Sequence, residues 1–462
     1  MTTTTTILET CHIPPPPAAN DLSIPLSFFD IKWLHYHPVR RLLFYHHPSS
    51  KSQFLHTIVP HLKQSLSLAL THYLPVAGNL LYPSNTEKFP QLRYAAGDSV
   101  PVTIAESNSD FESLTGNHTR DADQFYDLLP PIPPIEEESD WKLINIFAVQ
   151  ITLFPGEGIC IGFSNHHCLG DARSIVGFIS AWGEINGIGG YEGFLSNHSD
   201  SLSLPIFDRS FINDPNKIDA IFWKVLRNIP LKTASFPLPT NRVRSTFLLR
   251  RSDIEKLKTA TKSPASSFVA AAAFVWSCMV KSGDKSDENA PELFIIPADA
   301  RGRVDPPIPE NYFGNCIVSS VAQVERGKLA AEDGFAVAAE AIGGEIEGKL
   351  KNRDEILRGA ENWMSDIFKC FGMSVLGVSG SPKFDLLKAD FGWGKARKLE
   401  VLSIDGENHS MSLCSSSDFN GGLEVGLSLP RERMAAFEEV FRASIMAASG
   451  PARRSPALVE PL

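Results

Sequence analysis

A short stretch at residues 164–174, SNHHCLGDARS, contains the densest group of side chains that could do chemistry. Six consecutive positions of this stretch, 166–171, include His166, His167, Cys168 and Asp171. Four kinds of site suit such a group: a metal site, a cysteine nucleophile, a general base, or an ordinary turn whose aspartate caps a helix.

A metal site is the least favoured of the four. His167 and Asp171 stand four residues apart, a spacing that would join two ligands on a helix, but Gly170 and the β-rich run before it predict a connecting turn. The sequence has neither an HExxH pattern nor a third ligand nearby. We therefore expect no metal.

A nucleophile is also disfavoured, because neighbouring residues that leave a strand point to opposite sides, which separates Cys168 from His167. The serine-hydrolase elbow GxSxG is absent; GVSGS at 377–381 lacks the last glycine. The residues alone leave two interpretations open. Asp171 is a helix cap beside a hydrogen-bonded histidine, or His167 is a general base that removes a proton from a hydroxyl.

The flanking residues predict a hairpin, a turn and then a helix. Two β-rich runs, LINIFAVQITLF and ICIGFSN, surround PGEG at 155–158. After the motif, Ile175, Phe178, Trp182 and Ile185 recur at helical spacing. The motif therefore lies on the turn between a buried strand and an amphipathic helix.

Helix and strand signals alternate along the whole chain, which predicts an α/β protein. With 462 residues, the chain exceeds one core at ~100–200 residues per domain. Residues 186–206 are rich in Gly, Ser and Asn and predict a connection between halves. We expect one domain at 1–190, a crossover at 191–225 and a second domain at 226–462. An amphipathic helix is expected at 60–73.

Composition narrows the function classes. The net charge is −10 and no basic tract stands out, so nucleic acid and anionic membrane surfaces are disfavoured as partners. No apolar run approaches the ~20 residues that cross a bilayer, and the N-terminus lacks the features of a secretory signal. Seven cysteines are scattered singly, which favours reduced thiols in a cytoplasmic protein.

Three further strings, DFGWG (390–394), NYFGNC (311–316) and DARGR (299–303), are as distinctive as the histidine motif. Together with His167-Cys168-Leu169-Gly170-Asp171, they make this chain resemble the plant BAHD acyl-CoA-dependent acyltransferases. The likeness runs nearly end to end and includes FFDIKWL and LPVAGNL. YFGNC resembles the branch that acylates anthocyanins and other phenolic glycosides.

The resemblance implies a chloramphenicol acetyltransferase-like fold: two α/β domains of mixed sheets flanked by helices, with a channel between them. It implies a monomer that uses acyl-CoA as co-substrate and has no permanently bound cofactor. The reaction would transfer a malonyl or hydroxycinnamoyl group to a sugar hydroxyl of an anthocyanin, flavonoid or other phenolic glycoside. His167 would be the general base in a ternary complex, and no acyl-enzyme would form.

Other roles follow from the same resemblance. Asp171 would be turned away from the acceptor and paired with an arginine, for which Arg301 is the candidate and Arg303 the alternative. Asp390 of DFGWG is counted with His167 and Asp171 as functionally required, although the glycines and aromatic residues around it favour an architectural role.

Ligand contacts are expected at three places. Ser379 or Ser381, in the loop that leads to DFGWG, would donate to an oxyanion. A malonyl carboxylate would need a cation, supplied by Arg209, Arg40 or Arg41. The CoA phosphates would meet residues of the helix start KSPASSF and of GKARK, namely Lys262, Ser266, Ser267, Lys395, Arg397 and Lys398.

Several alternatives remain. HHCLGDA also resembles the HHxxxDG of peptide-synthetase condensation domains, with Ala172 in place of the last glycine. The others are a hydrolase that uses the same base, a non-catalytic binding protein of this fold, and an acyltransferase for a non-glycoside alcohol or amine. Release of CoA that depends on an acceptor separates transfer from hydrolysis.

Overall fold

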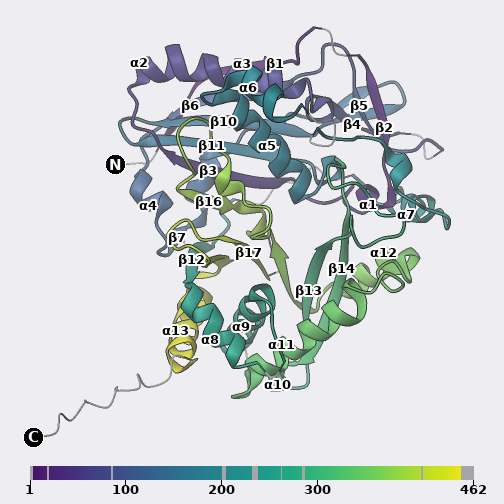
Figure 1. Ribbon diagram of the computed structural model, residues 1–462, viewed down its shortest axis with the longest axis vertical. Helices are drawn as coiled ribbons and strands as arrows, with labels where there is room; N and C mark the ends of the chain where they lie inside the picture. The colour runs from purple at the N-terminus through teal and green to yellow at the C-terminus, as the bar shows by residue number, and fades with distance from the viewer. Residues whose placement is uncertain are drawn as a thin grey trace, which may run out of the picture.

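Three β-sheets organise the described part of the chain in the computed structural model (Figure 1). The structure describes residues 4–17, 20–84, 87–199, 204–231, 238–261, 263–283, 287–406 and 409–448. Helices and strands alternate through both halves, so the predicted α/β class is confirmed.

The six-stranded sheet carries the histidine motif. Its strands, in spatial order, are β1 (Thr5–Ile13), β6 (Val100–Ser107), β10 (Phe147–Phe154), β11 (Gly158–Asn165), β3 (Val39–His46) and β16 (Lys398–Val401). The central strands β10 and β11 are buried along their whole length and form the predicted antiparallel hairpin. Their apolar residues fill both faces of the sheet, which explains the near-continuous hydrophobic runs in the sequence.

Two further sheets complete the molecule. The seven-stranded sheet runs β14 (Ile317–Glu325), β13 (Pro291–Asp299), β15 (Ser374–Ser379), β17 (His409–Ser415), β18 (Leu423–Leu429), β12 (Val243–Leu249) and β7 (Arg120–Asp121). The five-stranded sheet runs β2 (Leu22–Pro25), β5 (Gln91–Tyr94), β4 (Asn79–Pro83), β9 (Trp141–Asn145) and β8 (Glu136–Glu138).

Helices cover these sheets in two groups (Figure 1). The first group is α1 (Phe28–Ile31), α2 (Lys51–Gln53), α3 (Val59–Leu70), α4 (Phe111–Thr115), α5 (Ala172–Asn186), α6 (Gly190–Asn197) and α7 (Ile218–Leu226). The second group is α8 (Arg251–Thr259), α9 (Ser267–Lys281), α10 (Arg326–Ala330), α11 (Gly334–Glu345), α12 (Trp363–Lys369) and α13 (Arg431–Ala448). The described helices include none that is long and apolar enough to span a membrane.

Helix α5, which follows the histidine motif, packs against α3. The indole Nε1 of Trp182 donates to the carbonyl of Leu62 and to Ser65 Oγ, both at 3.1 Å. Helix α3 continues from α2 through one π-helical turn, so the helix expected at 60–73 begins earlier and ends at Leu70. These contacts fix α5 and therefore the turn from which it starts.

The two halves exchange strands across the expected division at 191–225. Strand β16 of the second half pairs with β3, and β7 of the first half pairs with β12. Buried ion pairs tie the exchanged strands together: Arg120 Nη1 lies 2.7 Å from Glu400 Oε1, and Arg244 pairs with Glu400 at 3.1 Å and with Asp405. Sequence patterns miss this exchange because both strands are short.

The crossover also differs from the expected irregular linker. Residues 191–225 contain most of α6 and α7, and a 3₁₀ turn, Arg209–Phe211, lies between the two helices. Phe194, Phe222 and Trp223 are buried and anchor these helices. Glycines and serines around them hid the helical signal.

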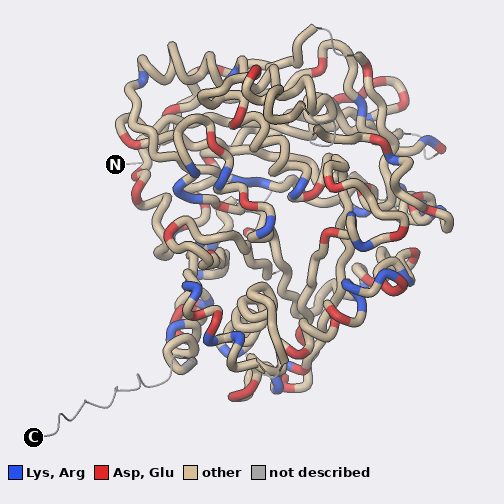
Figure 2. Tube along the Cα trace, viewed as in Figure 1, with Lys and Arg blue, Asp and Glu red and all other residues tan. Residues whose placement is uncertain are grey.

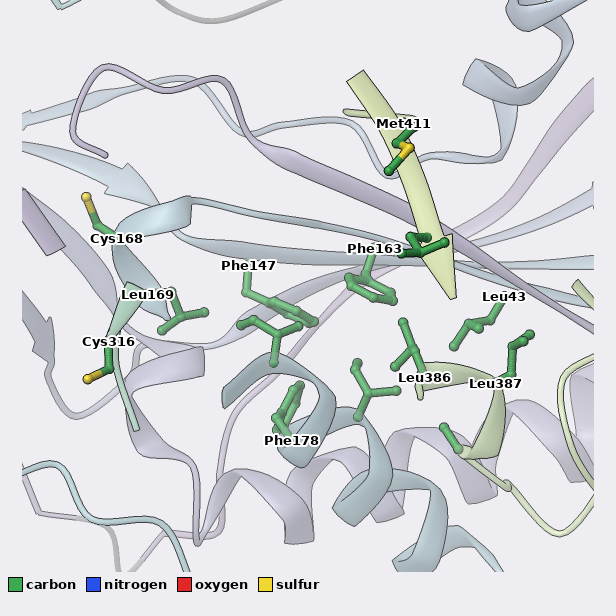
Figure 3. Close-up of a cluster of buried hydrophobic side chains, with 14 of the residues drawn as sticks. Leu43, Phe147, Phe163, Cys168, Leu169, Phe178, Cys316, Leu386, Leu387 and Met411 are labelled. Atoms are coloured by element: carbon green, nitrogen blue, oxygen red, sulfur yellow. The ribbon is translucent and has the colours of Figure 1, made fainter. Parts of the chain in front are cut away.

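A continuous apolar core joins the halves. Figure 3 shows Phe147, Phe163 and Phe178 facing Leu386, Leu387 and Met411, which come from the second half. Lys and Arg are interspersed with Asp and Glu along the trace in Figure 2, as the absence of a basic tract in the sequence implies.

Candidate active site

The histidine motif lies where the sequence predicts, on the turn between β11 and α5. His167 begins a single 3₁₀ turn, His167–Leu169, and Asp171 is the N-cap of α5. The Oδ1 of Asp171 accepts from the backbone N–H of Ser174 at 3.1 Å. A Cβ added at Gly170 would lie 2.8 Å from Ser174 Cβ, so the tight turn requires glycine.

Asp171 also forms a buried ion pair with Arg301. Arg301 Nη1 donates to Asp171 Oδ2 at 2.8 Å and Nη2 donates to Oδ1 at 3.1 Å, a bidentate geometry. Burial opposes the charge, but the carboxylate of Asp171 raises the pKa of Arg301 above its ordinary value. Arg303, the alternative partner, donates instead to the carbonyl of Leu350 at 3.2 Å. Asp171 thus connects the histidine turn to the segment DARGR through its ion pair with Arg301.

The side chain of Asn315 fixes the tautomer of His167. Asn315 Nδ2 donates to Asp30 Oδ1 at 3.0 Å and to the His167 carbonyl at 2.8 Å, which orients the amide. Its Oδ1 lies 3.2 Å from His167 Nδ1 and accepts the proton there. The Nε2 of the neutral ring is left with its lone pair, which is the atom a general base uses.

Asp30 is the anchor behind Asn315. It is fully buried in α1 and accepts from Ser27 Oγ at 2.7 Å and from the backbone N–H of Asn315 at 2.9 Å. Arg209 Nε lies 3.3 Å from its Oδ2. Asp30 therefore orients His167 through the amide of Asn315.

Trp33 packs flat on the imidazole of His167. The ring centroids are 3.9 Å apart with an interplanar angle of 10°, and Tyr36 meets the His167 ring edge-on at 6.1 Å. Burial, with smaller contributions from the positive charges of Arg41 and Lys32, lowers the pKa of His167 to about 3. The ring is therefore neutral at physiological pH and able to accept a proton.

Cys168 is not suited to be a nucleophile. Its side chain is fully buried, and its Sγ donates to the Asp30 carbonyl at 3.2 Å. Burial raises the pKa of the thiol well above its ordinary value, so no thiolate is available near neutral pH.

The NYFGNC segment clamps the histidine turn from the side of the second half. The Gly314 carbonyl accepts from Asp171 N–H at 3.3 Å and from Ser174 Oγ at 2.9 Å, and Cys316 N–H donates to Asp171 Oδ2 at 3.0 Å. Figure 3 shows Cys168 and Leu169 beside Cys316. Three of the distinctive strings therefore form one site.

DFGWG lies elsewhere, at the far end of α5. Asp390 is exposed, and its Oδ1 accepts from the backbone N–H groups of Gly392 and Gly394, both at 2.8 Å. Asn186, the last residue of α5, donates to the Phe391 carbonyl at 2.8 Å. The fifteen residues of α5 span roughly 22 Å, which places DFGWG away from His167, and a functional requirement for Asp390 stays a prediction. Asp390 stabilises a turn.

Two of the expected CoA contacts in GKARK are occupied by protein groups. Lys398 is buried, with its Nζ 2.5 Å from Asn117 Oδ1 and 3.3 Å from Glu424 Oε2. It does not reach a ligand, which corrects that expectation. Arg397 forms a bidentate pair with Glu112, whereas Lys395 is exposed.

The helix start KSPASSF is only partly described. Lys262 lies outside the described residues. Ser266 is the N-cap of α9 and its Oγ accepts from Val269 N–H at 3.2 Å, so its hydroxyl already serves the helix. Ser267 is the first residue of α9 and half-buried. A role of this segment in CoA binding stays a prediction.

The oxyanion candidates lie at the end of β15. Ser379 is half-buried there, and the Ser381 Oγ accepts from Lys383 N–H at 3.2 Å. The guanidinium of Arg173 sits over the Phe384 ring at 5.1 Å, so this loop packs beside the first turn of α5. Within the described residues neither hydroxyl contacts His167, and their role stays a prediction.

Sequence reasoning missed the three residues that orient His167: Asp30, Trp33 and Asn315. All three stand in strings that carried the family resemblance, FFDIKWL and NYFGNC. Their place in these two motifs was the only sequence signal for them, because the local pattern of apolar and polar residues does not predict that they lie beside a histidine.

Known proteins match the chain over nearly its full length. The model of the family described as "Transferase family" matches residues 3–444. Phenolic glucoside malonyltransferase 1 of Nicotiana tabacum is 42% identical over 94% of this chain and 98% of its own. The malonyl-coenzyme A:anthocyanin 3-O-glucoside-6''-O-malonyltransferase of Dahlia pinnata is 40% identical, covering 94% and 96%.

Solved structures share the fold. Vinorine synthase superposes with a TM-score of 0.68 at 20% identity, covering 94% of this chain and 96% of its own. The F. sporotrichioides TRI101, solved with coenzyme A and T-2, gives 0.65 at 17% identity, covering 89% and 96%. The predicted acetyltransferase-like architecture is thereby confirmed. The chain belongs to the Transferase family, the BAHD acyl-CoA-dependent acyltransferases that its motifs resemble.

Proposed function

We propose that this enzyme transfers a malonyl group from malonyl-CoA to a sugar hydroxyl of a phenolic or anthocyanin glucoside. The single observation that carries the mechanism is the hydrogen bond from His167 Nδ1 to Asn315 Oδ1. It leaves Nε2 unprotonated, as a base for a hydroxyl requires. The donor and acceptor classes rest on the relatives at 42% and 40% identity, whose names specify malonyl transfer to such glucosides.

The reaction follows from this geometry. His167 Nε2 takes the proton of the sugar hydroxyl as its oxygen attacks the thioester carbonyl of malonyl-CoA. The tetrahedral intermediate then collapses, the C–S bond breaks, and the CoA sulfur takes the proton from the imidazolium. A positioned base of this kind contributes ~10²–10⁴-fold, and the alignment of donor and acceptor supplies the rest.

The other residues of the site act through position. Asp171 is committed to Arg301 and to the start of α5, so its role is to hold the turn on which His167 stands. Ser379 or Ser381 would donate to the oxyanion, and Ser266, Ser267 and Lys395 would contact CoA. These assignments rest on the hydrogen-bonding and charged groups of the side chains. The seven cysteines are free thiols, which supports a cytoplasmic enzyme, and a monomer is the simplest assembly for a site built within one chain.

Release of the CoA thiol from purified enzyme tests the proposal. Malonyl-CoA and p-coumaroyl-CoA are offered in parallel with an anthocyanidin 3-glucoside, a flavonol glucoside or no acceptor. We expect release with malonyl-CoA only when a glucoside is present, and a mass increase of one malonyl group on the glucoside. Release without acceptor would indicate a hydrolase, and release with p-coumaroyl-CoA alone would overturn the donor assignment.

A further inference from the structure

Three cations were expected to compete for the malonyl carboxylate, and the structure separates them. Arg209 is occupied by Asp30 and by the Phe313 carbonyl at 2.7 Å. Arg40 is buried, and its charge interacts with Tyr126 and Asp405. Arg41, in contrast, forms no side-chain hydrogen bond and no ion pair with any described residue.

Arg41 lies on the active-site face of β3. Side chains alternate along a strand, so Arg41 shares a face with Leu43 and Tyr45, which belong to the main core with Phe163. Leu42 and Phe44 belong to a second cluster, on the face that Arg40 shares. Arg41 and Arg40 are therefore on opposite faces of the sheet.

The sheet register places Arg41 opposite the strand that leads to the base. Arg41 pairs across the strands with Phe163 of β11, four positions before His167. Figure 3 shows Phe163 and Leu43 facing the same apolar cluster, with the histidine turn at the other side of the cluster. Arg41 is half-buried, and its charge is near enough to lower the pKa of His167.

Burying part of a guanidinium removes water from its charge, and without a partner no ion pair offsets the free energy that is lost. Burial alone lowers the pKa of Arg41 to about 10, and no carboxylate counters this effect. Arg120, Arg244 and Arg301, in contrast, each form an ion pair with a carboxylate. A free carboxylate delivered by a substrate would complete the site with charge-assisted hydrogen bonds.

We propose that Arg41 binds the free carboxylate of the malonyl group and thereby sets the preference for a malonyl donor. The inference rests on the proposed malonyl transfer and names the residue that recognises the donor. The charge of Lys32 also acts on His167, but the Lys32 Nζ donates to the Ile317 carbonyl at 2.6 Å and lies 5.1 Å from the Trp33 and Trp363 rings. Its position is fixed by protein contacts.

The test compares kcat/KM for malonyl-CoA and for acetyl-CoA, which lacks the carboxylate, with one glucoside acceptor. For Arg41→Gln we expect a loss of about 10- to 100-fold with malonyl-CoA and a change of less than about 3-fold with acetyl-CoA. Arg41→Lys keeps the charge and should keep most of the malonyl preference. The matched control is Arg40→Gln, on the opposite face, which should leave the ratio of the two donors unchanged.

The outcomes separate the inference from the proposed function. An equal loss with both donors in Arg41→Gln, or no loss with either, would overturn the inference while malonyl transfer by the unchanged enzyme still stands. A reversal of the donor ratio in Lys32→Met with Arg41→Gln unaffected would assign the carboxylate to Lys32 instead. If the unchanged enzyme does not use malonyl-CoA, the proposed function itself fails.

Discussion

The Nδ1 of His167 lies 3.2 Å from the Oδ1 of Asn315, although 148 positions separate the two residues in the chain. The amide cannot be reversed without losing its donor bonds to Asp30 and to the His167 carbonyl. One hydrogen bond between the two halves therefore decides which nitrogen of the imidazole is free to take a proton. The predictions below test this arrangement.

Replacing Asn315 with alanine should lower kcat by about 10- to 100-fold, the loss typical when the partner that orients a histidine is removed. The imidazole would then exchange between tautomers. Histidine ¹⁵N chemical shifts should show one fixed tautomer at His167 in the unchanged enzyme and a mixture in the variant. A variant with unchanged kcat and an unchanged ¹⁵N pattern would show that Asn315 does not orient the base.

The ion pair between Arg301 and Asp171 should dominate the stability of the turn. Arg301→Leu leaves the buried Asp171 carboxylate without its cation, so the free energy of unfolding should fall by about 3–5 kcal/mol. Arg303→Leu is the matched control, since Arg303 gives one hydrogen bond to Leu350 and should cost about 1 kcal/mol. Urea unfolding followed by fluorescence measures both, and equal losses would contradict the assignment.

Asp390→Ala tests whether DFGWG takes part in proton transfer. The variant loses the acceptor for Gly392 and Gly394 N–H, so we expect a stability loss of about 1 kcal/mol, as for a lost helix cap. The acid limb of the pH–kcat/KM profile should stay where it is in the unchanged enzyme. A displaced or missing acid limb would show that Asp390 takes part in proton transfer.

The pH dependence should reflect the low pKa of His167. Burial lowers it from 6.5 to about 3, so the base remains deprotonated and active well below pH 6.5. The acid limb of kcat/KM should therefore lie below pH 6.5. A midpoint at or above 6.5 would show that the imidazole is solvated in the working enzyme.

The free energy of unfolding should also depend on pH because of the low pKa of His167. The unfolded chain binds a proton at His167 near pH 6.5 and the folded chain does not, so the free energy of unfolding falls as pH drops below 6.5. The slope from one such histidine is at most about 1.4 kcal/mol per pH unit. His167→Gln should flatten the curve between pH 6.5 and pH 5, which urea titrations at several pH values would show.

The sequence predicted the local part of the site. The β10–β11 hairpin, the turn at His167 and helix α5 follow from apolar periodicity, and Arg301 followed from the resemblance. These features depend on residues that are close in the chain, or on a short sequence motif that the family resemblance identifies.

The long-range part could not be read in this way. Asn315 and Asp30 are 285 positions apart, and their contact exists only because the second half packs against α1. Lys398 looked like an exposed cation because it stands in a basic string, but β16 enters the first sheet and buries it against Glu424. Periodicity reports which face of an element is apolar and leaves the partner of that face open.

The central claim is that His167 is the general base, and one comparison tests it most directly. Acceptor-dependent CoA release from malonyl-CoA is measured for the unchanged enzyme, His167→Ala and Cys168→Ala, at matched thermal stability. The account predicts a kcat lower by ~10²–10⁴-fold in His167→Ala and within about 10-fold of the unchanged value in Cys168→Ala. A His167→Ala enzyme that retains kcat within 10-fold, or a Cys168→Ala enzyme that loses it while folded, would contradict the claim.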